Sequence, residues 1–183
     1  PTCQWRRSVK LFRQNYECFE WIKAQYPGCR FVFLTLTVRN VPIDSLASRL
    51  TDMSAAWNRF TQRRDFKRLG LLGWLRVLEV TRNSFTGSYH PHFHVVLVVP
   101  GGCWLPDHSW WLRCWQLAAR DESIMFVNLR VVDGSKSSIE EVSKYVVKDS
   151  DFSGSAWVPE FTQLYSALSH VRCFSPAGCW RDS

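Results

Sequence analysis

The sequence predicts an α+β fold in which helices pack on an antiparallel sheet. Segments with the two-residue alternation of strands are separated by segments with the three- and four-residue spacing of helices. Two strand-like segments, 73–83 and 90–99, are joined through the turn-rich stretch SFTGS, which favours an antiparallel hairpin. With 183 residues, 46% of them hydrophobic, and no linker or repeat, the chain is expected to form one domain with a substantial core.

The first half of the chain is expected to form a helix, a strand and a long second helix. Residues 5–26 have a helical pattern that ends at Pro27 and Gly28. The strand-like segment 30–40 follows, and its two faces carry Val32, Leu34 and Leu36 on one side and Phe31, Phe33, Thr35 and Thr37 on the other. Pro42 then opens a helix with apolar residues at helical spacing, Leu46, Leu50, Met53, Trp57 and Phe60, and with basic residues in its last turns, Arg59, Arg63, Arg64, Lys67 and Arg68.

The second half continues the alternation of strands and helices. After the hairpin, residues 106–121 are expected to form a helix capped by Asp107, because an aspartate side chain accepts the unpaired N–H groups of a first turn. A strand is expected within 123–134, a helix at 137–149 and a last helix from Val158 to Ser169.

Three histidines at alternate positions begin the segment HPHFHVVLVV: His90, His92 and His94. Alternate side chains of a strand share one face, so the three imidazoles are expected to form one row. The residues that follow are all apolar, which indicates a central strand, and buried imidazoles without partners would be costly there. We therefore interpret the row as metal ligands.

A carboxylate on the preceding strand is placed to complete such a site. Glu79 lies between Leu78 and Val80, so it faces away from these apolar neighbours; an ordinary surface charge is the alternative. Two imidazoles and one carboxylate leave coordination positions open on a divalent ion. This is how a metal polarises a phosphoryl oxygen instead of only holding a fold together.

A second group of polar residues occupies the predicted helix 137–149. Glu141, Tyr145 and Lys148 are four and three residues apart and share one helix face. A packed tyrosine beside an ordinary helix ion pair would explain this row by itself. Together with the histidines, a phenol between a carboxylate and an ammonium group indicates a nucleophile with assisting groups.

The composition favours nucleic acid as the partner. The net charge is +7, and the chain holds 10 Trp, 12 Phe and 5 Tyr. Cations neutralise phosphates and aromatic rings stack on bases, a combination that suits single strands, although the cations near residue 64 could equally stabilise a helix end. Seven cysteines without a framework spacing indicate free thiols in a reducing cytoplasm. No apolar run approaches the roughly 18 residues of a membrane span.

Three motifs, in order along the chain, resemble those of the HUH endonucleases: FLTLT (33–37), HPHFHVVL (90–97) and KYVVK (144–148). The resemblance is closest to the single-tyrosine replication initiators of rolling-circle plasmids, and it extends to LRVLEVT and HVRCFSPAGCW. It implies a ferredoxin-like, or RRM-like, sheet of five antiparallel strands. It also implies that residues 1–183 form one nicking and origin-binding domain. The start at Pro1, without a methionine, leads us to expect that this domain is excised from a longer protein.

The resemblance assigns the metal ligands. His92 and His94 correspond to the paired histidines of the family, and Glu79 to its third ligand. His90 could be a further ligand, support a ligand or contact DNA. The cofactor implied is a divalent ion, Mn²⁺ or Mg²⁺.

The resemblance also assigns the catalytic residues. Tyr145 corresponds to the tyrosine that attacks the scissile phosphate and becomes joined to the DNA 5′ end, and Lys148 to a lysine that steadies the phosphate or the metal site. Many relatives have a second tyrosine one turn before the first; Glu141 stands there, and we expect it to be a general base that hydrolyses the final strand transfer. DNA contacts are expected at basic residues, namely Arg39, Arg63, Arg64 and Lys144.

The implied partners are single-stranded or hairpin origin DNA and a host helicase and polymerase, in the cytoplasm of a prokaryote and away from membranes. One alternative is a transposase or relaxase of the same superfamily. Relaxases usually place the tyrosine before the histidines, whereas Tyr145 follows them, which disfavours that branch. The alternative from another class is a metal-stabilised module that binds single-stranded DNA without catalysis.

Overall fold

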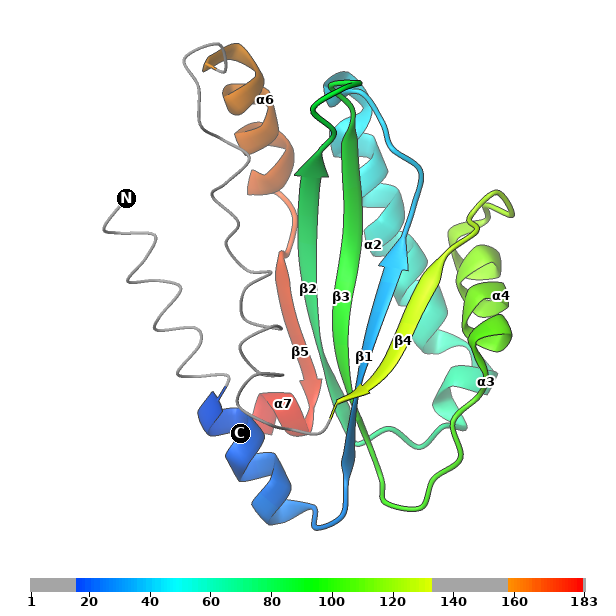
Figure 1. Ribbon diagram of the computed structural model, residues 1–183. Helices are drawn as coiled ribbons and strands as arrows, with labels where there is room; N and C mark the ends of the chain where they lie inside the picture. The colour runs from blue at the N-terminus through cyan, green and yellow to red at the C-terminus, as the bar shows by residue number, and fades with distance from the viewer. Residues whose placement is uncertain (1–15, 133–157, 183) are drawn as a thin grey trace.

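The structure, a computed structural model, describes residues 16–132 and 158–182. Its centre is a five-stranded sheet in the order β4-β1-β3-β2-β5, and every neighbouring pair is antiparallel (Figure 1). The strands are β1 (Arg30–Thr37), β2 (Gly73–Arg82), β3 (Tyr89–Val99), β4 (Val127–Val132) and β5 (Phe174–Gly178). The predicted α+β class, with five antiparallel strands, is therefore confirmed.

Helices cover both faces of this sheet. Residues 16–25 are helical, and the other described helices are η1 (Ile43–Ser45), α2 (Leu46–Gln62), α3 (Arg64–Lys67), α4 (His108–Ala119), α6 (Val158–Ser169) and α7 (Cys179–Asp182). The predicted cap of α4 is confirmed, because the Asp107 carboxylate accepts the Trp110 backbone N–H at 2.9 Å. The predicted helix 137–149 lies outside the described ranges. Within those ranges, no helix has the length and apolar character that crossing a membrane requires.

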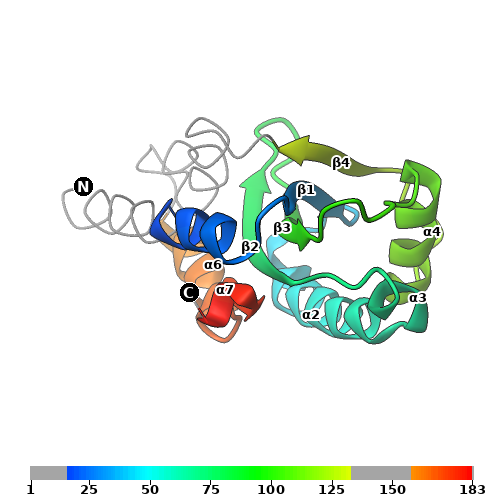
Figure 2. The same ribbon diagram turned by 90° about the horizontal axis from the view of Figure 1, so that it is seen from below.

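The sheet separates two apolar clusters. The larger cluster joins the Val32, Leu34 and Leu36 face of β1 to aromatic side chains of α2 and α4, among them Trp57, Phe60, Trp111 and Trp115. The smaller cluster, on the other face, joins Phe31, Phe33, Val96 and Val98 to Phe19, Ile22 and Trp180. Figure 2 shows the resulting layers, with α2 and α4 on one side of the sheet and the helix of residues 16–25 on the other.

The long helix predicted from Pro42 is divided in the structure. Pro42 precedes the short 3₁₀ turn η1, and α2 ends at Gln62 because Arg63 has extended backbone angles, φ −59° and ψ 138°. The change of direction brings the Phe66 ring to 4.9 Å from that of Phe60, between ring centroids, inside the larger cluster. The prediction that the basic residues from 63 to 68 continue this helix is therefore wrong. Arg59 is the one basic residue in the last turn of α2.

Strand β5 has no counterpart among the segments predicted from their alternation. It is five residues long and contains Pro176, which has no N–H to donate to a neighbouring strand and is tolerated at the edge of a sheet. It ends at Gly178, whose φ of +56° is the left-handed conformation that glycine adopts without strain. A Cβ on Gly178 would lie 2.3 Å from the Leu72 carbonyl oxygen, so β5 docks on β2 by a close backbone approach.

Replacing Gly178 by alanine is expected to destabilise the fold more than the same change at Gly70. Both glycines have positive φ, +56° and +61°, so both substitutions carry a backbone strain of roughly 1–2 kcal/mol. At Gly70 the new methyl group would meet nothing within 4 Å, whereas at Gly178 it would collide with the Leu72 carbonyl. We expect an additional loss of roughly 1–3 kcal/mol for G178A, measured by urea denaturation. Equal losses in the two variants would contradict the close docking of β5.

Candidate metal centre

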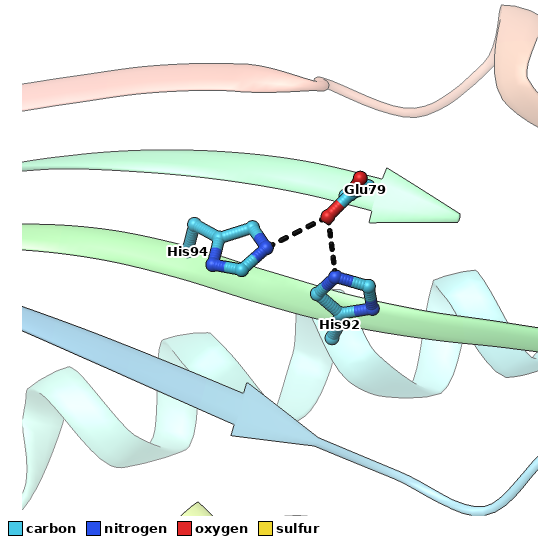
Figure 3. A group of neighbouring side chains, drawn as sticks. All are labelled: Glu79, His92 and His94. Atoms are coloured by element: carbon cyan, nitrogen blue, oxygen red, sulfur yellow. Dashed lines mark hydrogen bonds and ion pairs between the residues drawn. The ribbon is translucent and has the colours of Figure 1, made fainter. Parts of the chain in front are cut away.

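The pairing of β2 with β3 brings a carboxylate and two imidazoles together on one face of the sheet. Glu79 is directly opposite His92 in the β2–β3 register, and His94 is two residues further along β3 on the same face. Figure 3 shows the three side chains pointing toward one another from the two strands. The predicted ligands Glu79, His92 and His94 are therefore adjacent in space. We refer to them as the Glu–His–His group.

The geometry of the group is compact. Oε2 of Glu79 lies 2.6 Å from Nε2 of His92 and 2.8 Å from Nε2 of His94. One ligand atom from each residue can be chosen so that all three lie within 4.8 Å of one another, and all three side chains are buried, at 5–8% exposure. Three potential ligand atoms thus converge on a single point.

Contacts behind the imidazoles hold both rings in place. Nδ1 of His92 lies 3.2 Å from the carbonyl oxygen of His90, and since a carbonyl can only accept, this nitrogen carries the proton of the hydrogen bond. Nδ1 of His94 lies 3.3 Å from the Thr35 hydroxyl, and its ring stacks on Phe33 with centroids 5.3 Å apart. Each Nε2 is thereby directed toward Glu79, an arrangement typical of histidines that bind metal through Nε2.

The charge balance of the group also suits a cation. Burial raises the pKa of Glu79, but its hydrogen-bond contacts with His92 and His94 and the electrostatic effect of these two side chains lower it further, and the result is a pKa of about 2. The carboxylate is therefore ionised at neutral pH. One carboxylate and two imidazoles form a donor set that fits divalent ions of the first transition row and leaves coordination positions open. The residues present thus fit the divalent metal that the sequence resemblance implies.

His90 lies beside this group but outside it. Its ring is half-buried, with the centroid 5.4 Å from that of His92, and the set of converging ligand atoms does not include it. Burial and the nearby His92 lower the pKa of His90, and a hydrogen bond with the Val38 backbone opposes them. The contribution that the structure does record is its carbonyl, which orients His92. The three roles left open by the sequence stay predictions for its side chain.

The remaining predicted site residues fall into two classes. Arg39 is exposed just after β1. Arg63 lies between α2 and α3 and Arg64 begins α3, on the side of the sheet opposite the Glu–His–His group. The catalytic assignments and the fourth proposed DNA contact lie outside the described residues: Glu141, Lys144, Tyr145 and Lys148. Their roles stay predictions.

Two supporting residues were not singled out from the sequence. Thr35 and Phe33 both contact His94, and both lie in the motif FLTLT. The alternation of β1 already placed them on one face, but only the pairing of Thr35 with His94 shows that this face carries the Glu–His–His group. The missing information was the register between β1 and β3.

Comparison with known proteins gives a consistent result. A family model described as replication protein matches residues 1–183. Proteins named Protein rep are 33% identical to the chain in Bacillus amyloliquefaciens, over 82% of the chain and 50% of the relative, and in Streptococcus pneumoniae, over 81% and 49%. Another, from Lactiplantibacillus plantarum, is 33% identical over 83% of the chain and 52% of the relative. The chain thus spans about half the length of these relatives, and no solved structure matches it.

Mn²⁺ is expected to raise the melting temperature of EDTA-treated protein, because an ion that binds the folded state alone stabilises it. H94A removes one of three donors and E79Q removes the negative charge of another, so each variant should lose most of this shift. H170A, which removes an exposed histidine after α6, should keep it. Differential scanning fluorimetry across a Mn²⁺ titration measures the shift. If the wild type responds and E79Q and H94A respond equally, the ion binds elsewhere.

Proposed function

Since the chain belongs to the replication protein family, we propose that it is the nicking domain of a plasmid rolling-circle replication initiator. It would cut and rejoin single-stranded DNA at the plasmid origin. The observation that carries the proposal is the Glu–His–His group, a buried set of potential metal ligands on one face of an antiparallel sheet. The order of the three sequence motifs supports it.

The Glu–His–His group would hold the ion, either Mn²⁺ or Mg²⁺. Bound there, a divalent ion would withdraw charge from a non-bridging oxygen of the scissile phosphate, which otherwise repels a nucleophile. Thr35 and the His90 carbonyl keep the two imidazoles oriented. Because hydrogen bonds fix these rings before DNA arrives, the site needs little rearrangement to bind the phosphate.

Tyr145 would perform the chemical step. Its phenol oxygen attacks phosphorus, the bond from phosphorus to the 3′ oxygen breaks, and the phenolic proton passes to that oxygen. The protein then carries the DNA 5′ end as a phosphotyrosine, and the free 3′ hydroxyl can prime a polymerase. A phenol has a pKa of about 10, and the positive charge of Lys148 would favour the phenolate. One phosphoester replaces another, so the reverse reaction rejoins the strand.

The proposed partners follow from this reaction. The substrate would be an unpaired or hairpin-extruded origin strand, because the phosphate must reach side chains on the face of a sheet. Arg39 and Lys144 are proposed contacts to its phosphates. A helicase and a polymerase of a bacterial host would then extend the nicked strand, and the site of action would be the cytoplasm.

The decisive experiment detects the covalent adduct. Incubating the protein with labelled single-stranded origin DNA and Mn²⁺ should give a complex that survives denaturing electrophoresis. Y145F keeps the ring but removes the nucleophile, so the adduct should disappear. Y165F is the matched control, because Tyr165 is 68% exposed on α6 and has no proposed role. Reversible binding without any adduct in the wild type would support the non-catalytic binding module instead.

Glu141 is expected to act after the first cut. It stands four residues before Tyr145 in the sequence, and its carboxylate would take a proton from the water that hydrolyses the last phosphotyrosine. E141Q keeps the shape and removes the base. The variant should therefore still form the Tyr145 adduct but lose the water-dependent release of a second strand. This release is measured by quenching the reaction at timed intervals and separating the products on a denaturing gel.

The alternative hypothesis, that Glu141 only forms an ordinary ion pair with Lys144, predicts a different result. In that case E141Q would lower thermal stability while release proceeds at the wild-type rate. Unimpaired release in a folded E141Q protein would therefore eliminate the general-base role.

A further inference from the structure

A groove runs between α3, the segment 100–107 and α4. It consists of two adjoining hollows of about 520 and 390 Å³, and Asp65, Trp104 and Trp110 line both of them. Figures 1 and 2 show α3 and α4 side by side on the margin of the molecule. The helices that form the groove pack on the larger apolar cluster, so the groove and the Glu–His–His group lie on opposite sides of the sheet.

Trp104 is the most prominent side chain of this groove. Its indole is 76% exposed, although tryptophan is strongly apolar and usually at least partly covered. Trp110 beside it is held by an edge contact with the buried Trp111, at 5.0 Å between ring centroids, and so gives the groove a fixed wall. An exposed planar ring next to a fixed wall is suited to receive another flat group by stacking.

Arginine side chains line the same groove. Arg63, Arg68 and Arg113 line the hollows, and Arg64 is exposed on α3 nearby. Among the described residues, Arg68 forms no ion pair, while Arg63 pairs with Asp65 at 3.3 Å and Arg113 with Glu122 at 3.8 Å. These two ion pairs are solvent-accessible and contribute little to the stability of the fold. A phosphate can therefore compete with the carboxylates for the guanidinium groups.

We propose that this groove is a second nucleic-acid contact site, which binds a single strand away from the metal centre. Phosphates would lie against Arg68 and Arg113, and a base would stack on Trp104. Guanidinium groups beside an exposed aromatic ring fit a nucleotide better than an acidic peptide, which offers charge but no flat group. The inference rests on the DNA-binding part of the proposed function and not on its chemistry.

The two sites would hold different stretches of DNA. The sheet and its larger apolar cluster, including Trp57, Phe60 and Trp111, separate the groove from the Glu–His–His group. A nucleotide on Trp104 therefore cannot also be at the metal centre. The groove would anchor a flanking stretch while the metal face holds the scissile phosphate.

The test measures binding without cleavage. Fluorescence anisotropy in EDTA follows a labelled 30-nucleotide single strand of mixed sequence added to the protein. W104A is expected to weaken binding by about tenfold, since loss of one stacked base commonly has an effect of this order. W104F keeps a ring and should restore most of the affinity, and F85A, which removes a ring 98% exposed at the hairpin tip, should change little.

The arginines have a separate readout. Each phosphate contact to a single strand contributes about 0.7 to the slope of log affinity against log salt concentration. R68A should therefore lower the slope by about that amount, whereas R181A, a change at an exposed arginine on α7, should leave it unaltered. An unchanged slope for R68A would remove Arg68 from the contact.

The outcomes also separate this inference from the proposed function. If the wild type binds the strand and W104A binds it equally well, the second site is wrong while the nicking proposal stands. Failure of the wild type to bind the mixed strand in EDTA would overturn the second site, and failure to bind origin DNA with Mn²⁺ as well would overturn both. If polyglutamate binds more tightly than the strand in a Trp104-dependent way, the groove is a site for acidic peptides and the inference is wrong.

Discussion

The register of β2 against β3 is the constraint on which the candidate site depends. It places Glu79 opposite His92 and on the same face as His94, two residues further along β3. A single carboxylate oxygen therefore reaches both Nε2 atoms. Alternate residues of a strand point to opposite faces, and a slip of one residue would therefore send Glu79 into the aromatic cluster on the other side. The short hairpin turn and the apolar residues of both strands prevent such a slip. Fold and site are thus specified by the same pairing.

The unequal covering of the sheet allows a polar group to be buried in it. On one face, four aromatic side chains of α2 and α4 pack against β1 and β3, and this cluster supplies much of the apolar burial. On the other face, a smaller apolar cluster occupies only part of the surface, and the Glu–His–His group lies on the same side. Burying a carboxylate costs free energy, and its close contacts with two imidazoles offset that cost.

The same layering gives the protein two surfaces with different chemistry. The face with the Glu–His–His group has the donors for a divalent ion, and the margin formed by α3 and α4 has arginines around an exposed tryptophan. The break at Arg63 matters for the second surface. By ending α2 early, it turns α3 toward the segment 100–107 and so creates the groove. A continuous helix would have carried the basic residues 63–68 away from Trp104.

The sequence by itself determined the fold class, most of the strands and the three converging ligands, because these follow from short-range spacing. Histidines at alternate positions must share a face, and a central apolar strand requires a partner for them. The fifth strand, the break at Arg63, and the contacts of Thr35 and Phe33 with His94 were decided by tertiary structure alone. Pro176 and Gly178 have weak strand propensity, and β5 exists because β2 offers it an edge. Arg63 departs from helical geometry where Phe66 packs against Trp111 in the core, and Thr35 meets His94 only through the β1–β3 register. Each of these features joins residues far apart in the chain, so no local pattern records it.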